Sequence, residues 1–142
     1  MKSRSKIGDE TIQAYRDTEY RVEGDAPFVL RVGCVSQDLL RHYSRLGLHS
    51  CAFITACNPF SNPLGEEENS LRDRNLVLLL SARGYRSVVG VGLHPSNGWP
   101  GEKSRLVWGI ARDHASDVAR EFKQNALIWV AEDAVPQLIL LR

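Results

Sequence analysis

The stretch Cys51-Ala-Phe-Ile-Thr-Ala-Cys-Asn-Pro59, with Glu68-Asn69-Ser-Leu-Arg72 shortly after it, decides how this chain folds. The apolar run 51–56 is typical of a buried central strand, and Asn58-Pro59 ends that strand in a polar turn. A helix is predicted from about Gly65, because the three glutamates that follow would complement the positive end of its dipole. A buried strand that ends in a polar turn beside a helix start is a common place for a site. This stretch indicates no particular reaction or ligand.

Outward from this stretch, the hydrophobic periods alternate between those of helices and those of strands. The long helix that begins near Gly65 contains the apolar block Leu76–Leu80 and should stop at Gly84, and this block predicts that it is the most buried helix. The other predicted elements are a helix at Glu10–Tyr15, strands at Tyr20–Val22 and Phe28–Val32, a helix capped by Ser36 that ends at Gly47, a strand at Ser87–Gly92, a rigid loop at Leu93–Gly101, a strand at Leu106–Ile110, a helix at Asp113–Phe122 and strands at Leu127–Val130 and Gln137–Leu141.

The predicted order αββαβαββαββ contains both local hairpins and helical crossovers, so the sheet should be mostly antiparallel or mixed. We therefore expect one α+β domain over residues 1–142 with about four helices, in which residues 1–8 form a flexible N-terminal tail. A chain of 142 residues with 43% hydrophobic residues has enough apolar material for one core.

Charge and composition exclude several classes of protein. Eighteen Lys and Arg stand against 17 Asp and Glu, so a net charge of +1 gives no overall field toward nucleic acid or an anionic membrane. No apolar run reaches the about 20 residues that span a bilayer, and we expect a cytoplasmic protein with no membrane partner. Three cysteines without Cys-x-x-Cys spacing, and four histidines without a metal-binding spacing, predict free thiols and no metal site. Gly90-Val91-Gly92 lies inside a predicted strand, so no nucleotide cofactor is indicated.

Several polar residues have both a structural and a functional interpretation. Glu68, Asn69 and Arg72 project from one helix face. They form either an exposed ion pair or a partly desolvated group under the Asn58 turn that orients a ligand. Asn58 is also a good turn former without any ligand.

Further candidates lie in later loops. Trp99 and Glu102 flank Pro100-Gly101, where the tryptophan either stacks on a ligand or covers the edge of the core. Gln124 and Asn125 follow a predicted helix, as a C-cap in which Asn takes the left-handed conformation or as amides that bind a ligand. The imidazole of His94 is a candidate acid or base, and the thiol of Cys57 is a candidate nucleophile.

With these residues in view, the chain resembles a bacterial family known as domain of unknown function 3293. The resemblance rests on Ala52-Phe53-Ile54-Thr55-Ala56-x-Asn58-Pro59, Glu68-Asn69-x-x-Arg72, Trp99-Pro100-x-Glu102, Phe122-x-Gln124-Asn125-Ala126 and Leu138-Ile139-Leu140-Leu141-Arg142. It covers the chain from about Tyr20 to the end. Two positions depart from the family pattern, since Cys57 stands where tryptophan is usual and His94 where aspartate is usual, which weakens a catalytic role for either.

The resemblance implies no established activity. It implies a strongly bent sheet related to the Sm-like barrel, a fold that often binds RNA and forms homo-oligomers. It also implies that the family's polar positions share one site, for which the candidate ligand-binding residues are Asn58, Glu68, Asn69, Arg72, Trp99, Glu102, Gln124 and Asn125.

Three hypotheses of function follow. The first is a binding module for a small polar ligand, a nucleotide or a short RNA, in which Arg72 meets a phosphate or carboxylate. The second, a structural or partner-binding protein, uses the polar residues as an internal hydrogen-bond network. The third is a small hydrolase with Glu68 or Glu102 as general base. The first is preferred narrowly over the second, with the enzyme third.

Overall fold

The computed structural model describes residues 5–142, which form one α+β domain around a seven-stranded sheet. The helices are α1 (Asp9–Asp17), α2 (Gln37–Leu46), α3 (Glu66–Ala82) and α4 (Arg112–Glu121), with a short 3-10 turn at Pro59–Ser61. The strands are β1 (Glu19–Val22), β2 (Phe28–Leu30), β3 (Cys51–Thr55), β4 (Ser87–Leu93), β5 (Glu102–Trp108), β6 (Ala126–Val130) and β7 (Pro136–Leu140). This order of elements is the predicted one.

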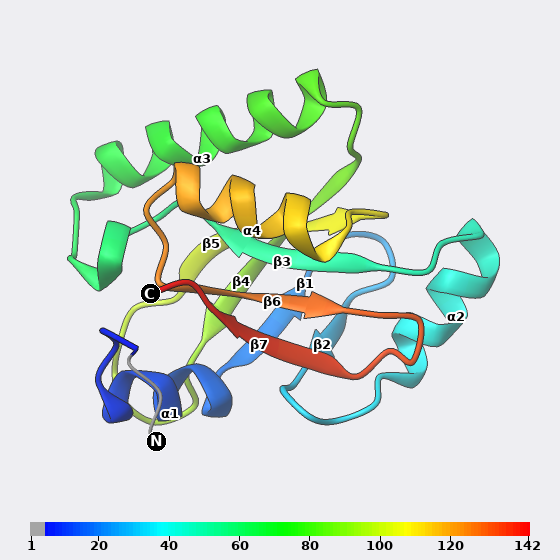
Figure 1. The fold of residues 1–142 in the computed structure, drawn as a ribbon, viewed down its shortest axis with the longest axis horizontal. Coiled ribbons are helices and arrows are strands. Elements are labelled where there is room, and N and C mark those ends of the chain that lie inside the picture. The colour runs from blue at the N-terminus through cyan, green and yellow to red at the C-terminus, as the bar shows by residue number, and fades with distance from the viewer. Residues whose placement is uncertain (1–4) are drawn as a thin grey trace.

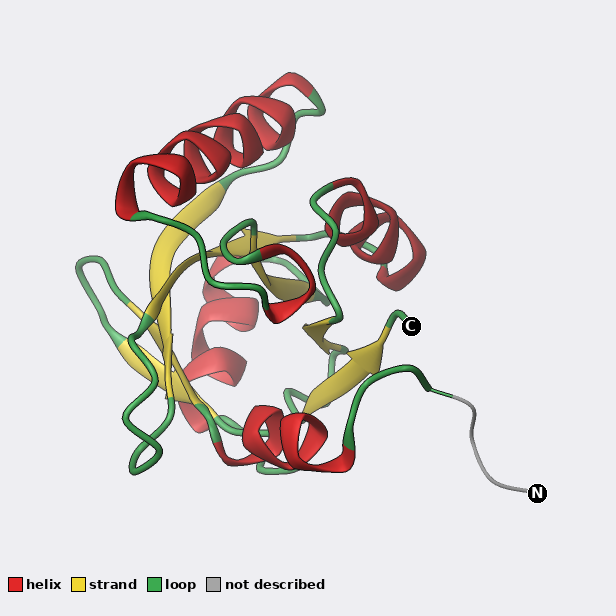
Figure 2. Ribbon diagram, turned by 90° about the vertical axis from the view of Figure 1, so that its left-hand side faces the viewer, coloured by secondary structure: helices red, strands yellow, loops and turns green. Residues whose placement is uncertain are grey.

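Every pair of neighbouring strands is antiparallel, in the order β2-β1-β4-β5-β3-β6-β7. The sheet curls into a half-barrel, as Figure 2 shows. Its two edges approach each other where the amide of Gly33, just after β2, donates to the carbonyl of Pro136 at the start of β7 (2.9 Å). The predicted α+β class is confirmed; of the predicted alternatives, a mostly antiparallel or a mixed sheet, the structure has the antiparallel one, and β3 lies near the centre as expected.

The curled sheet has two hydrophobic cores because successive side chains of a strand point to opposite faces. On β3, Ala52 and Ile54 pack on the convex face against Leu76 and Leu80 of α3 and against α4. Cys51 and Phe53 point into the concave face, where Leu39 and Tyr43 of α2 meet them. Figure 1 shows α3 and α4 on one side of the sheet, while α1 and α2 lie at opposite ends of the molecule.

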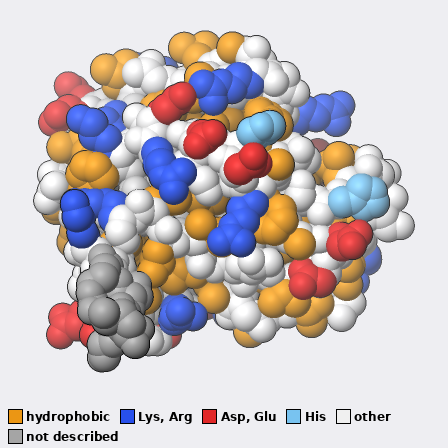
Figure 3. Space-filling model, viewed as in Figure 1, with side chains coloured by type: hydrophobic (Ala, Val, Ile, Leu, Met, Phe, Trp, Pro, Cys, Tyr) orange, Lys and Arg blue, Asp and Glu red, His pale blue; other side chains and the backbone are white. Residues whose placement is uncertain are grey.

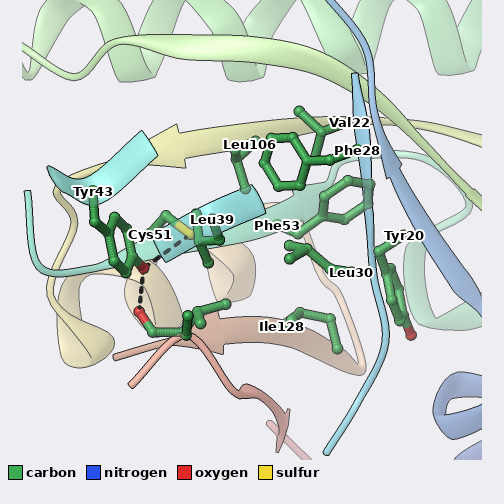
Figure 4. Packing of buried hydrophobic residues seen from close by; sticks show 12 residues of the cluster. Tyr20, Val22, Phe28, Leu30, Leu39, Tyr43, Cys51, Phe53, Leu106 and Ile128 are labelled. Carbon is green, nitrogen blue, oxygen red and sulfur yellow. Dashed lines mark hydrogen bonds between the residues drawn. The ribbon is translucent and has the colours of Figure 1, made fainter. Parts of the chain in front are cut away.

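The end of the concave face beneath α2 is densely filled. Tyr43 donates from its hydroxyl to the Val130 carbonyl (3.0 Å) and contacts the sulfur of Cys51, as the dashed lines in Figure 4 mark. Burial raises the pKa of the Cys51 thiol to about 12, so this sulfur acts as a packing group. Toward the opposite end, Tyr20 packs edge-on against Phe53, with ring centroids 5.3 Å apart.

Local signals fixed several helix ends as predicted. Ser36 caps α2 by accepting the amide of Leu39 (3.0 Å), and Gly47 ends it in the left-handed conformation (φ 68°). Gly84, with φ 83°, follows the end of α3.

Three predictions about individual elements were wrong. The helix α3 is not the most buried one, since Leu71 and Leu78 are 50% and 67% exposed; only one face of its apolar block reaches the sheet. The strand β5 starts at Glu102 rather than Leu106, because pairing with β4 continues through polar residues. The left-handed residue after α4 is Lys123 (φ 57°) rather than Asn125.

Part of the expected N-terminal tail is described. Residues 1–4 lie outside the described residues, whereas the Ser5 hydroxyl donates to the Arg142 carbonyl (2.7 Å) and Ile7 is buried. Within residues 5–142, no helix combines the length and hydropathy needed to cross a bilayer.

Candidate functional site

The concave face holds a cavity of about 350 Å³ at the end away from α2, which we call the concave cavity. Its floor consists of inward-pointing side chains of five strands: Tyr20, Phe53, Thr55, Ser104, Ile128 and Leu138. Thr55 and Ser104 are directly paired across β3 and β5 and are the polar residues of an otherwise apolar floor; their hydroxyls donate to the main-chain carbonyls of Lys103 (2.8 Å) and Glu102 (3.0 Å). The floor combines apolar area with a few polar groups, as ligand pockets usually do.

Two glycines of β4 shape this floor. A Cβ at Gly90 would lie 2.7 Å from both the Arg21 carbonyl oxygen and Phe53 Cε2, so only glycine lets the Phe53 ring lie this close to the strand. Gly92 lines the cavity itself and contributes no side chain to fill it. In the predicted strand Gly90-Val91-Gly92, the first glycine therefore allows the close packing of Phe53, and the second leaves room for the cavity.

Three segments form the walls. The helix α1 contributes Glu10 and Tyr15, the turn 58–61 contributes Asn58 and Ser61, and the loop 94–101 contributes His94, Asn97 and Trp99. These segments are far apart in the sequence and meet only because the sheet curls.

Glu102 is the principal charged group of the cavity. It begins β5, and its Oε2 accepts a hydrogen bond from Asn58 Nδ2 (2.7 Å). Burial raises the pKa of the Glu102 carboxyl, while hydrogen bonds from Asn58 and Trp99 partly counter that rise. A carboxyl with a raised pKa in a cavity can exchange a proton or meet a ligand donor.

The turn 58–61 is strained. Asn58, Phe60 and Ser61 all have positive φ values (48°, 52° and 63°), a region that residues with a Cβ adopt at a cost. The amide of Asn58 donates to Asn69 Oδ1, and Asn69 Nδ2 donates back to Asn58 Oδ1, each at 2.9 Å. This reciprocal pair locks the turn onto α3.

Arg72 bonds the main chain beside the same turn. Its Nε donates to the Ala56 carbonyl and its terminal nitrogen to the Phe122 carbonyl, and its guanidinium lies 6.0 Å from the centre of the Phe122 ring. Within residues 5–142, no ion pair joins it to Glu68, which is exposed on α3. Arg72 thus ties the end of β3 to the end of α4, and it is not among the residues that line the cavity.

Gln124 and Asn125 complete the support. Gln124 Nε2 donates to the Cys57 carbonyl (3.0 Å), and Asn125 Nδ2 donates to Ser61 Oγ (3.0 Å) and to the Tyr15 hydroxyl (3.2 Å). Arg142 donates to Asn125 Oδ1 (3.0 Å). Throughout residues 5–142, every fully buried side-chain nitrogen or oxygen has a hydrogen-bond partner.

The predicted site residues therefore separate into two groups. Asn58, Trp99, Glu102 and Gln124 line the concave cavity. Asn69, Arg72 and Asn125 support its wall through the contacts above, and Glu68 lies apart from both groups on the exposed face of α3. Sequence reasoning missed the cavity residues from α1, because nothing in the chain indicates which surface that helix covers. It also missed Thr55, whose alternation with Phe53 along β3 was a usable signal, and Ser104, which becomes its neighbour only through the pairing of β3 with β5.

The structure places both residues that were expected to depart from the family pattern, His94 and Cys57. His94 Nδ1 accepts the amides of Ser96 (3.1 Å) and Asn97 (3.0 Å), which is the local bonding that an aspartate side chain gives to such a turn. His94 therefore supplies the acceptor that shapes the loop. Cys57 is buried, and burial raises the pKa of its thiol, which opposes a nucleophilic role.

Metal ligands do not converge in the described part of the chain, where no three His, Cys, Asp or Glu side chains are grouped for an ion.

A family model described as "Protein of unknown function (DUF3293)" matches residues 54–127, which confirms the resemblance over that span; the motif at residues 138–142 lies beyond it. No curated protein and no solved structure matches the chain.

Proposed function

The chain belongs to the DUF3293 family, and we propose that it is a binding module whose ligand is a small molecule held in the concave cavity. The observation that carries this proposal is the cavity of about 350 Å³ into which the desolvated carboxyl of Glu102 points. This volume is at the lower end of the range of about 300–1,000 Å³ for small-molecule sites. A cavity of this size holds a compact ligand.

The polar family residues support this proposal by holding the wall. The hydrogen bonds of Asn69, Arg72 and Asn125 reach the strained turn and the main chain just after β3 and α4, beside that turn. This fixes Asn58, which in turn bonds Glu102. Binding gains when the groups that meet a ligand are ordered beforehand, because less conformational entropy is lost. The internal network and the binding site are thus parts of one arrangement.

A small ligand fits better than a nucleotide or a short RNA. Among the described residues, the cavity lining includes Glu10 and Glu102 but neither lysine nor arginine. Phosphate binding depends on cationic side chains, and RNA requires many such contacts. On the face in Figure 3, cationic and anionic side chains intermingle over the surface. The Sm-like relationship, assembly into homo-oligomers, a bacterial source and a cytoplasmic location stay predictions.

A filled-cavity variant tests the proposal. Ala126 lies in β6 and lines the cavity, so Ala126→Phe would place a ring in the ligand space. We expect a fragment library, screened by ligand-observed NMR, to give hits on the wild type that disappear in Ala126→Phe. Native mass spectrometry of gently purified protein would add any co-purified ligand. Hits that persist in a folded Ala126→Phe, or a screen without hits, would contradict the proposal.

A hydrolase is the second candidate, and the raised pKa of Glu102 is the observation that favours it, since a general acid or base needs such a carboxyl. Of the two predicted bases, only Glu102 lines the cavity. Turnover of an identified ligand that stops in Glu102→Gln would establish this function.

A further inference from the structure

We infer that the ligand of the concave cavity carries a protonated nitrogen, an amine or amidine, attached to a compact apolar body. This inference rests on the proposed function and specifies its ligand. It follows from the charges of the lining, the free capacity of one carboxylate and the character of the floor.

The charges of the lining have one sign. The carboxylates are Glu102 on the inner wall and Glu10 on α1, and among the described lining residues there is no lysine or arginine. His94 is the remaining group there that could carry positive charge, and its Nδ1 already accepts two backbone amides. An anionic ligand would meet like charge without a counter-ion, which is costly where water is excluded.

Glu102 has capacity for a further donor. A carboxylate offers about four lone-pair sites, and its partners in the protein are the neutral donors of Asn58 and Trp99. These neutral donors do not provide the positive charge that would stabilise a carboxylate removed from water. A ligand ammonium group would supply both a donor and that charge, in the type of hydrogen bond that is roughly twice as strong as a neutral one.

Trp99 gives a second contact suited to a cation. Its ring lines the cavity at the rim and is 43% exposed, and its amide is fixed by Asn97 Oδ1 (2.9 Å). The face of an indole attracts a cation within about 6 Å of its centre. The rim and the inner carboxylate therefore favour the same ligand charge.

The floor accounts for the apolar body. Tyr20, Phe53, Ile128 and Leu138 present aromatic and aliphatic surface. The hydroxyls of Thr55 and Ser104 donate to main-chain carbonyls, which leaves the floor largely apolar. Because the Tyr20 hydroxyl donates to the Tyr15 carbonyl (2.6 Å), its ring is held in place with its apolar side available to the cavity. A ligand with an aromatic or branched aliphatic group would bury that group here.

The test uses three small compounds with a phenyl ring and a short polar end: 2-phenylethylamine, 2-phenylethanol and phenylacetate, which are cationic, neutral and anionic at pH 7. Their affinities are measured by ligand-observed NMR titration. We expect the amine to bind the wild type about tenfold more tightly than the alcohol, a ratio equivalent to about 1.4 kcal/mol, and phenylacetate to bind most weakly. In Glu102→Gln the amine should lose its advantage over the alcohol, while Glu67→Gln, at an exposed position of α3, should keep it.

The outcomes separate this inference from the function on which it rests. Equal or tighter binding of the alcohol, or an amine preference that persists in Glu102→Gln, would overturn the inference. If the three compounds bind equally and Ala126→Phe blocks all of them, the inference fails and the binding module stands. If none binds and the fragment screen gives no hit sensitive to Ala126→Phe, both fail. Comparing two compounds on the same variant makes the result independent of any change in stability.

Discussion

Replacement of Arg72 gives the sharpest prediction about stability. In Arg72→Ala the Ala56 and Phe122 carbonyls lose their guanidinium donor, and the packing of the side chain against the Phe122 ring is lost as well. Hydrogen bonds to charged groups contribute about 1.5–3 kcal/mol each, so two of them set the loss at about 3–6 kcal/mol. A protein of this size loses roughly 3 °C of melting temperature per kcal/mol, which gives a decrease of roughly 9–18 °C.

The assay is chemical denaturation followed by tryptophan fluorescence, which yields the free energy of unfolding. Arg72→Lys should lose about half as much, because an ammonium group keeps the charge but cannot bond both carbonyls with the same fork. Arg74→Ala, at an exposed position of the same helix, should change stability by less than about 0.5 kcal/mol. If Arg72→Ala were as stable as Arg74→Ala and yet no longer bound ligand, Arg72 would be a ligand contact and our account of it would be refuted.

Three further predictions concern the turn, the cavity carboxyl and the floor. Asn58→Ala should be less stable than Asn58→Gly by about 1–2 kcal/mol in denaturant titrations, because alanine must hold the left-handed backbone (φ 48°) that glycine adopts freely; equal stability would argue against strain. Burial raises the folded-state pKa of Glu102, so its stabilising contribution is complete below its unfolded pKa and is lost as pH rises through the folded value. Glu102→Gln should therefore have a higher free energy of unfolding than the wild type at pH 7–8, by about 1.4 kcal/mol for each unit by which the folded-state pKa of Glu102 is raised. This difference in stability should vanish near pH 4; a difference that stays constant with pH would refute the raised pKa. Gly90→Ala should cost about 2–3 kcal/mol because its Cβ would lie 2.7 Å from Phe53, whereas at Gly92 the nearest atom is 3.7 Å away and the cost should be below about 1 kcal/mol; similar melting temperatures would contradict the close approach.

The order of the elements was predictable because local signals agreed with the final fold. Ser36 and Gly47 mark the two ends of α2 through their capping alone. The apolar run at 51–56 is compatible with few structures other than a central strand. The burial of α3 was mispredicted because a run of five apolar residues reveals nothing of how much of the helix the sheet can cover. Coverage depends on the curl of the sheet, which is a property of the whole chain.

The candidate site was predictable in its membership more than in its roles. Helix periodicity placed Asn69 and Arg72 on one face, yet it could not show that their donors turn inward to the main chain. The positive φ of Asn58 and its neighbours is a consequence of those contacts and leaves no simple mark in sequence. The contribution of Tyr15 from α1 depends on how the N-terminal helix packs across the open end of the half-barrel, which no local pattern encodes.

A two-dimensional amide NMR titration of the wild type with 2-phenylethylamine shows directly whether the concave cavity binds a ligand. We expect shifts for the indole of Trp99 and for amides of the concave floor at Thr55, Gly92 and Ser104, with little change around Leu71 and Leu78 on the exposed face of α3. Shifts centred on α3, with none in the floor, would contradict the concave cavity as the binding site.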